Sequence, residues 1–142
     1  MRRTFTLDDA IQVARRAHEG QMDKSGRPYI AHSLRVMGAL RDERERMAAV
    51  LHDVIEDTTV TLVDLTDAGC PPEVLAAVAA VTKQPGEDQS AYLARVAANP
   101  IALAVKRADI ADNMSPDRLS RLDAATQERL RAKYESALRQ LG

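Results

Sequence analysis

The chain has 142 residues, which fits one compact domain and leaves little room for a second. Its 20 Lys and Arg residues nearly balance its 21 Asp and Glu residues, so a net charge of −1 gives no reason to expect nucleic acid or an anionic membrane as the main partner. Aromatic residues make up 3% of the chain and Trp is absent, so small aliphatic side chains have to build the core, which suits closely packed helices.

Apolar residues recur with a helical period along nearly the whole chain, and no segment shows the convincing alternation of a strand. In chain order, the expected helices cover about residues 7–19, 29–40, 43–57, 62–68, 73–81, 90–98, 100–114, a short segment after 115–117, and 124–141. Thr6 and Asp9 have the spacing of a capping box, and Asn99 separates two helices as a cap. The sequence therefore predicts an all-α fold, a single compact helical bundle of seven to nine helices over residues 1–142.

Two targeting features are not seen in the sequence. No apolar run approaches the roughly 20 residues of a membrane helix, and no apolar signal core follows the basic residues 1–3. Cys70 is the single cysteine, so an internal disulfide is not possible. We therefore expect a reduced, cytoplasmic protein.

One histidine stands out because acidic residues follow it closely. His52 and Asp53 precede Glu56 and Asp57 at the end of the expected helix 43–57. Adjacent residues on a helix diverge by about 100°, so His52 and Asp53 share a metal ion only if it lies over the edge between them. Carboxylates at a helix C-terminus cost stability unless a positive charge compensates. A metal ion and a solvated acidic helix end are two interpretations that this pattern alone does not separate.

A second acidic position lies in the expected helix 100–114. Asp109 borders the buried stripe of that helix, and Asn113 lies one turn further along. A carboxylate beside a buried face needs a partner. That partner is either a metal ion or one of the neighbouring cations, Lys106 and Arg107, and on this pattern alone the salt bridge is favoured.

The other two histidines give weaker signals. His32 lies off the apolar stripe formed by Ile30, Leu34 and Met37, so on its own it favours a structural or exposed residue over a ligand. His18 lies on the apolar stripe of the first helix, and we interpret it as a packed core histidine.

Four blocks of the chain form one recognisable pattern. They are AHEGQ at 17–21, KSGRPYIAH at 24–32, HDVIEDT at 52–58 and VKRADIADNM at 105–114. Together they resemble the hydrolase domain of RelA/SpoT proteins, within the HD superfamily of metal-dependent phosphohydrolases, and most of all the stand-alone small alarmone hydrolases. The HD pair alone is a weak motif, whereas HDxxEDT with the other three blocks is specific. The resemblance covers about residues 14–114 and implies an HD-domain helical bundle.

The resemblance also implies a metal site and a reaction. The family's metal ligands correspond here to His32, His52, Asp53 and Asp109. The family's usual ion is Mn²⁺, and two imidazoles with two carboxylates suit such an ion, although Zn²⁺ and Fe²⁺ remain alternatives. The implied reaction removes pyrophosphate from the 3′ position of guanosine 3′,5′-bis(diphosphate), leaving GDP, or GTP from the pentaphosphate.

The remaining site residues are implied in the same way. The family's catalytic acidic pair corresponds to Glu56 and Asp57, and substrate contacts are assigned to Lys24, Ser25 and Asn113. Further candidates for substrate contacts follow the last block, although exposed cations on a terminal helix are more often just solvated. These candidates are Arg118, Arg121, Lys133 and Tyr134.

One departure from the family pattern motivates an alternative. Asp23 replaces the Arg of the family's common Arg-Lys pair, so a phosphohydrolase acting on another phosphorylated nucleotide is a second hypothesis. A third hypothesis is a non-catalytic helical module, against which the intact set of metal and acidic residues argues. We expect a small-molecule nucleotide as partner, with no nucleic acid and no membrane, and the sequence leaves the oligomeric state open.

Overall fold

The computed structural model describes residues 4–23 and 26–142, so the predicted substrate contacts Lys24 and Ser25 lie outside the described residues. The helices are α1 Leu7–Ala17, α2 Tyr29–Gly38, α3 Glu43–Leu51, α4 Val54–Asp57, α5 Leu62–Asp67, α6 Pro72–Val81, α7 Gln89–Ala97, α8 Pro100–Asn113, α9 Pro116–Leu119 and α10 Ala124–Leu141. The residues described include no strand, and only an isolated bridge joins Met22 to Pro28. The predicted all-α class is confirmed.

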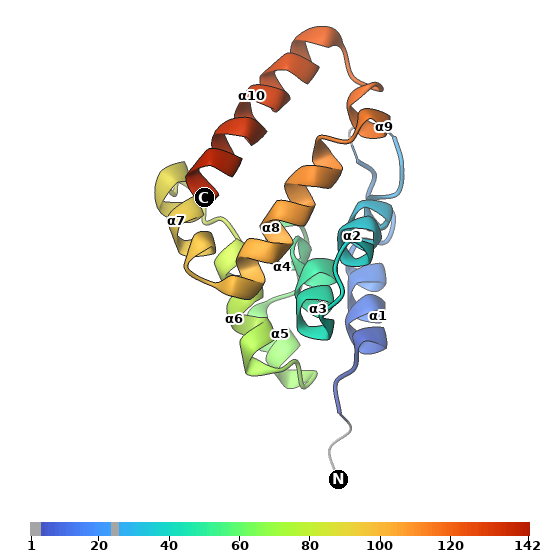
Figure 1. Cartoon of the computed structure of the whole chain (residues 1–142). Helices are drawn as coiled ribbons and strands as arrows, with labels where there is room; N and C mark the ends of the chain where they lie inside the picture. Colours follow the sequence, from blue (N-terminus) through green and yellow to red (C-terminus); the bar gives the residue numbers. More distant parts are fainter. Residues whose placement is uncertain (1–3, 24–25) are drawn as a thin grey trace.

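The long helix α8 runs through the middle of the bundle (Figure 1). It packs against α2, α3, α6 and α7, and α9 leads from its C-terminal end into α10, which returns alongside it. The aromatic side chains in the core of the described chain are Phe5 and Tyr92. Ala48 and Ala49 are fully buried, and these small side chains let α3 approach the helices around it closely.

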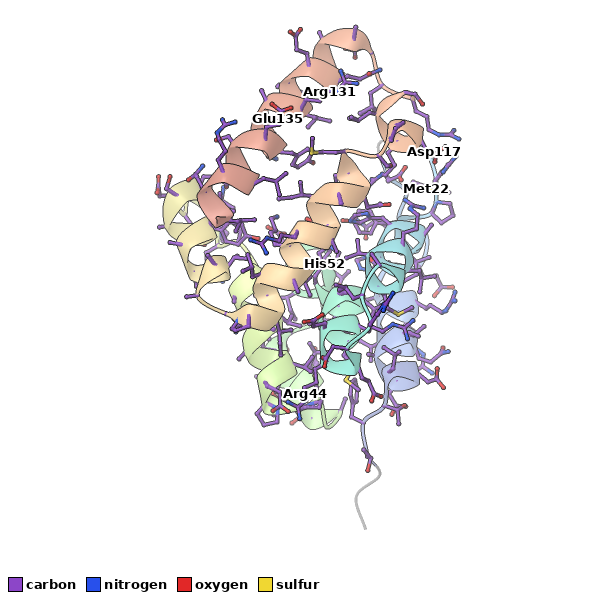
Figure 2. The ribbon with its side chains drawn as sticks, in the orientation of Figure 1. Met22, Arg44, His52, Asp117, Arg131 and Glu135 are labelled. Atoms are coloured by element: carbon purple, nitrogen blue, oxygen red, sulfur yellow. The ribbon has the colours of Figure 1, made fainter. Side chains whose placement is uncertain are left out.

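Helix α3 is buried on all sides over its last five residues, 47–51, because α1, α2, α6 and α8 surround it. His52 follows directly, so it lies in the interior and not on a surface helix. Figure 2 shows His52 near the centre of the molecule, close to α8. The apolar run of α3 therefore carries the first residue of the HD pair into the core.

Several predicted helix starts are confirmed by their caps. The Thr6 side chain accepts from the Asp9 backbone N–H, and Asp9 accepts in return from the Thr6 backbone N–H, which completes the capping box. Asn99 Oδ1 accepts from the Ala102 N–H at 3.0 Å. Thr61 and Asp64 form a second capping box that the sequence analysis missed.

The predicted helix 43–57 is wrong in one respect, because it divides into α3 and α4 at His52 and Asp53. The carbonyl of Ala49 accepts from the His52 backbone N–H at 3.3 Å and from its ring Nδ1–H at 2.5 Å, which diverts that carbonyl from the regular helical ladder. Asp53 then takes φ −103° and ψ 0° and begins α4. This break accounts for ten helices in the described residues where seven to nine were predicted.

None of the helices in the described part of the chain combines the length and the hydropathy that a membrane-spanning segment requires.

Candidate metal centre and its flanking cavities

Four side chains from three separate parts of the sequence meet in the interior. His32 comes from α2, His52 follows α3, Asp53 precedes α4 and Asp109 comes from α8. One ligand atom of each lies within 4.8 Å of the other three. The break between α3 and α4 makes this possible, because His52 and Asp53 face the same point although they are adjacent in the chain. His52 Nε2 lies 3.0 Å from Asp53 Oδ2.

The position of His32 differs from the expectation. Its side chain is 1% exposed, and the buried face of α2 runs through His32, Ser33 and Val36. The predicted stripe residues, such as Leu34, are only half-buried. The expectation that His32 lies off the core side was therefore wrong, because α8 packs against α2 on this face. The interpretation of His18 as a buried core histidine is confirmed, since it is 2% exposed.

Both imidazoles turn the same nitrogen toward the cluster. His52 Nδ1–H donates to the Ala49 carbonyl, and His32 Nδ1–H donates to Asp112 Oδ2 at 2.6 Å. The Nε2 atoms then face Asp109 Oδ1, at 2.9 Å from His32 and 3.2 Å from His52. A histidine that binds a metal ion usually donates its other ring N–H to a carboxylate or a carbonyl in this way. The ring orientations therefore fit a metal site.

The two carboxylates of the cluster have further partners. Asp53 Oδ2 accepts from the Tyr29 hydroxyl, and Lys106 Nζ lies 3.4 Å from Asp109 Oδ2. Burial and the neighbouring Asp53 raise the pKa of Tyr29, so the phenol keeps its proton and acts as a donor. The salt bridge predicted for Asp109 is thus present, and it uses a different oxygen from the one that faces the imidazoles.

The charges of the cluster are strongly coupled. Burial lowers the pKa of His52, but the Asp53 and Asp109 carboxylates outweigh it and raise the pKa well above its usual value. Burial likewise raises the pKa of Asp109, but His52 and His32 hold it well below its usual range. The buried Asp109 carboxylate and the half-buried Asp53 carboxylate require positive charge at this point, supplied either by protons on the imidazoles or by a divalent ion. Donor type, orientation and charge therefore all fit a divalent metal ion.

Glu56 and Asp57 lie in α4, close to the cluster but outside its four-atom group, and both are exposed. Partial desolvation and the nearby Asp53 carboxylate raise the pKa of each side chain. They lie within one short turn of Asp53, and not at the end of a long helix as predicted. Their catalytic role stays a prediction.

Two cavities flank the cluster and share Asn113 and Tyr134 as walls. The first, of about 270 Å³, we call the neutral cavity because Arg118 faces Asp23 in its wall. Its other lining residues are Gln21, Met22, Tyr29, Leu122 and Leu130. The predicted contact Asn113 therefore lies beside both cavities, and its Nδ2 donates to Asp109 Oδ1 at 3.3 Å.

The second cavity, of about 230 Å³, we call the lysine cavity. Its charged lining residues are Lys83, Lys106, Lys133, Glu56 and Asp109. Three lysines against two carboxylates leave it positive. Of the candidates named after the last sequence block, Arg121 alone does not line either cavity, and it pairs with Asp117 at 3.9 Å.

Tyr29 and Lys83 are two of the site residues that the sequence analysis missed. Tyr29 precedes His32 by three positions on α2, a spacing that places both on one helix face and that could have suggested the contact. Lys83 follows α6 and carries no such signal, because only the packing of α6 against α8 brings it to the cavity.

Comparisons with known proteins agree with this geometry. A family model described as "HD domain" matches residues 10–110. The bifunctional (p)ppGpp synthase/hydrolase SpoT of Escherichia coli K12 is 51% identical over 63 residues, which is 42% of this chain and 9% of that protein. A GTP pyrophosphokinase of Streptomyces coelicolor is 40% identical over 122 residues, which is 76% of this chain and 14% of that protein. The chain thus spans a small fraction of these relatives' length.

A solved structure of a metazoan orthologue of SpoT, described as hydrolysing ppGpp, has the same fold. It superposes with a TM-score of 0.80 and 23% identity, covering 99% of this chain and 88% of that one. At this level of identity the likeness shows the fold.

Proposed function

This chain belongs to the HD-domain family, and on that premise we propose that it removes pyrophosphate from the 3′ position of guanosine 3′,5′-bis(diphosphate). The products would be GDP and pyrophosphate, or GTP and pyrophosphate from the pentaphosphate. The observation that carries this proposal is the buried group of His32, His52, Asp53 and Asp109 with its imidazoles oriented by outer partners. The names of the matched relatives, which include a (p)ppGpp hydrolase, support the choice of substrate.

The four residues of the cluster would hold the ion, and Mn²⁺ is our proposal for its identity. Such an ion, when bound, lowers the pKa of a bound water and neutralises charge that builds on the phosphoryl oxygens. Both imidazoles have to lose their Nε2 protons for this, which their Nδ1–H donors to Asp112 and to the Ala49 carbonyl permit.

Glu56 and Asp57 would act on the attacking water. A carboxylate with a raised pKa is a better base near neutral pH than an ordinary one, so either side chain suits removal of the water proton. The water oxygen bonds to the phosphorus attached to the 3′ oxygen, and the bond from that phosphorus to the 3′ oxygen breaks. The 3′ oxygen takes up a proton and pyrophosphate leaves, so atoms and charge balance.

The two cavities would divide the substrate between them. Neither reaches the roughly 300 Å³ at the low end of ligand sites, since they measure about 270 and 230 Å³. A nucleotide that bridges the cluster and occupies both has enough room. The positive lysine cavity suits phosphate groups, whereas the neutral cavity, with Leu122, Leu130 and Tyr134 in its wall, suits the base.

The proposal is tested with purified, Mn²⁺-loaded protein and guanosine 3′,5′-bis(diphosphate), with pyrophosphate measured directly. Release of pyrophosphate with GDP supports the proposal, and its absence contradicts it. One observation favours a second candidate: the carboxylate of Asp23, in the wall of the neutral cavity, suits a different phosphorylated nucleotide. A substrate panel separates the two, because orthophosphate release from a nucleotide monophosphate indicates the second candidate.

A further inference from the structure

Arg118, from the short helix α9, reaches back to the end of α8 and to the loop before α2. Its Nη1 donates to Asn113 Oδ1 at 2.5 Å and to Asp112 Oδ2 at 3.4 Å. Its Nη2 lies 3.5 Å from Asp23 Oδ2. The Arg118 side chain is 15% exposed and the Asp23 side chain 2%, so these contacts are largely shielded from solvent and are more than a surface ion pair.

Two of these partners lead directly to residues of the metal cluster. Asp112 Oδ2 accepts the Nδ1–H of His32 at 2.6 Å, and Asn113 Nδ2 donates to Asp109 Oδ1 at 3.3 Å. The Arg118 guanidinium therefore contacts Asp112 and Asn113, and each of these two residues hydrogen-bonds to a different residue of the cluster.

The first route runs through a carboxylate and not through the imidazole itself. Arg118 Nη1 lies 2.9 Å from His32 Nδ1, but both atoms are donors when Nε2 faces a metal ion. Asp112 Oδ2 is the acceptor that both share. Arg35 Nε donates to the other oxygen of the same carboxylate, Asp112 Oδ1, at 2.8 Å. Asp112 is thus clamped between two guanidinium groups.

The second route fixes the amide of Asn113. Its Oδ1 faces Arg118 and its Nδ2 faces Asp109, so the arginine determines which end of the amide meets the cluster. Within residues 4–23 and 26–142, Arg118 is the donor that holds this oxygen away from Asp109. A rotated amide would place an oxygen against a carboxylate and repel it.

We infer that Arg118 is a positioning residue for the metal centre, holding Asp112 and Asn113, and through them His32 and Asp109, in the arrangement that binds a divalent ion. Partners of this kind affect metal affinity by about 10- to 100-fold when they are removed. The planar guanidinium carries five donors in a fixed fork, which a lysine does not reproduce. The inference rests on the proposed metal-dependent function, but its test needs no nucleotide.

The test is a titration of the metal-free full chain with Mn²⁺ alone, followed by the electron paramagnetic resonance signal of the free ion. Arg118→Met should weaken Mn²⁺ binding by about 10- to 100-fold. Arg121→Met is the matched control, because Arg121 is an exposed arginine two positions beyond α9 whose partner, Asp117, lies outside the cluster. It should bind Mn²⁺ within about twofold of the wild type.

The Arg118→Lys variant separates the effect of the positive charge from the effect of the guanidinium geometry, because lysine keeps the charge but lacks the planar set of donors. It should recover less than half of the lost affinity on a logarithmic scale. Replacing Mn²⁺ by Co²⁺ adds a spectroscopic readout, since the visible bands of Co²⁺ report ligand geometry. The bands should shift in the Arg118 variants and stay unchanged in Arg121→Met.

The outcomes are distinct. Mn²⁺ binding within twofold of the wild type in both Arg118 variants, with unchanged Co²⁺ bands, overturns the inference and leaves the proposed reaction standing. A wild type that binds Mn²⁺ and releases no pyrophosphate overturns the reaction and leaves the positioning role standing. Circular dichroism confirms folding before each titration. If Arg118→Met does not fold, Arg118→Lys and Asp112→Asn decide the question, and wild-type affinity in both overturns the inference.

Discussion

The neutral cavity and the lysine cavity both lie beside the candidate metal cluster and share Asn113 and Tyr134, and yet they differ in charge. In the neutral cavity the cation, Arg118, faces a carboxylate, whereas in the lysine cavity cations outnumber carboxylates. A net charge of −1 for the whole chain conceals this difference. The fold therefore sorts charge locally, and this would give the proposed nucleotide substrate two chemically different places to bind.

The largest effect should come from disrupting the four-residue cluster beside which both cavities lie. His52→Ala deletes a proposed metal ligand and leaves the Asp53 and Asp109 carboxylates short of positive charge, so we expect metal binding and activity to fall by more than about 100-fold. Metal content by mass spectrometry and pyrophosphate release measure this. His18→Ala is the control, because it also removes a buried imidazole, but one that lies outside the cluster and bonds Gln21. Equal losses in the two variants would contradict the assignment.

A slightly smaller effect is expected for the acidic pair, which should act on rate and not on metal binding. Asp57→Asn should lower kcat by about 100-fold or more, since general bases contribute on this scale. Mn²⁺ affinity should stay within a few-fold of the wild type, because Asp57 is outside the cluster. Steady-state kinetics test this, with the exposed carboxylate of Asp67 as the site of a control Asp→Asn change. Full activity in Asp57→Asn would remove this residue from the mechanism.

The candidate metal centre was more predictable from sequence than the cavities were, and the reason is physical. Short motifs carry His52, Asp53 and Asp109, and helical spacing limits where their side chains can lie. The burial of His32 was not predictable from α2 alone, because it depends on α8 packing over that face. The break at Asp53 likewise depends on the hydrogen bond from the His52 ring to the Ala49 carbonyl, which helix propensities do not predict.

The cavities are assembled from segments far apart in the chain. Lys83 follows α6, Lys106 belongs to α8 and Lys133 to α10, and only tertiary packing brings them together. The pattern of α10 predicted a helix correctly over residues 124–141 but did not show which of its residues face α8. The sequence therefore predicted the residues of the short motifs, but it did not predict which distant charged residues the fold brings together in each cavity.

Lys83 gives the most direct test of the charge of the lysine cavity. Lys83→Met should raise KM by about 10- to 100-fold, the value of a charged hydrogen bond to phosphate. It should also weaken the salt dependence of KM, because one charge interaction is lost. Arg131→Met is the control, since Arg131 is exposed on α10 and lines neither cavity (Figure 2). An unchanged KM in Lys83→Met would mean that phosphate does not bind in the lysine cavity.

The stability of the fold at acid pH should depend on the Asp112 carboxylate, which lies between Arg118 and Arg35. Burial raises the pKa of Asp112, but His32 and Arg35 outweigh it and lower the pKa from 3.8 to about 2. A lowered folded-state pKa stabilises the fold above the unfolded value, and this stability is lost as the pH falls from 3.8 toward about 2. The loss should be about 2 kcal/mol at most. Urea unfolding at several pH values should show a shallower acid dependence in Asp112→Asn, and identical curves would contradict the clamp.

The smallest effect is expected on the apolar wall of the neutral cavity. Leu130→Ala removes part of a half-buried side chain, which is worth about 1 kcal/mol and should raise KM about fivefold. The salt dependence of KM should stay at its wild-type value, because no charge is altered. Leu138→Ala is the matched control on the same helix, where the side chain is exposed and lines neither cavity. Since Lys83→Met should alter the salt dependence and Leu130→Ala should not, the pair of variants tests whether the two cavities recognise chemically different ends of one substrate. A Leu130→Ala enzyme with wild-type KM would place the base elsewhere.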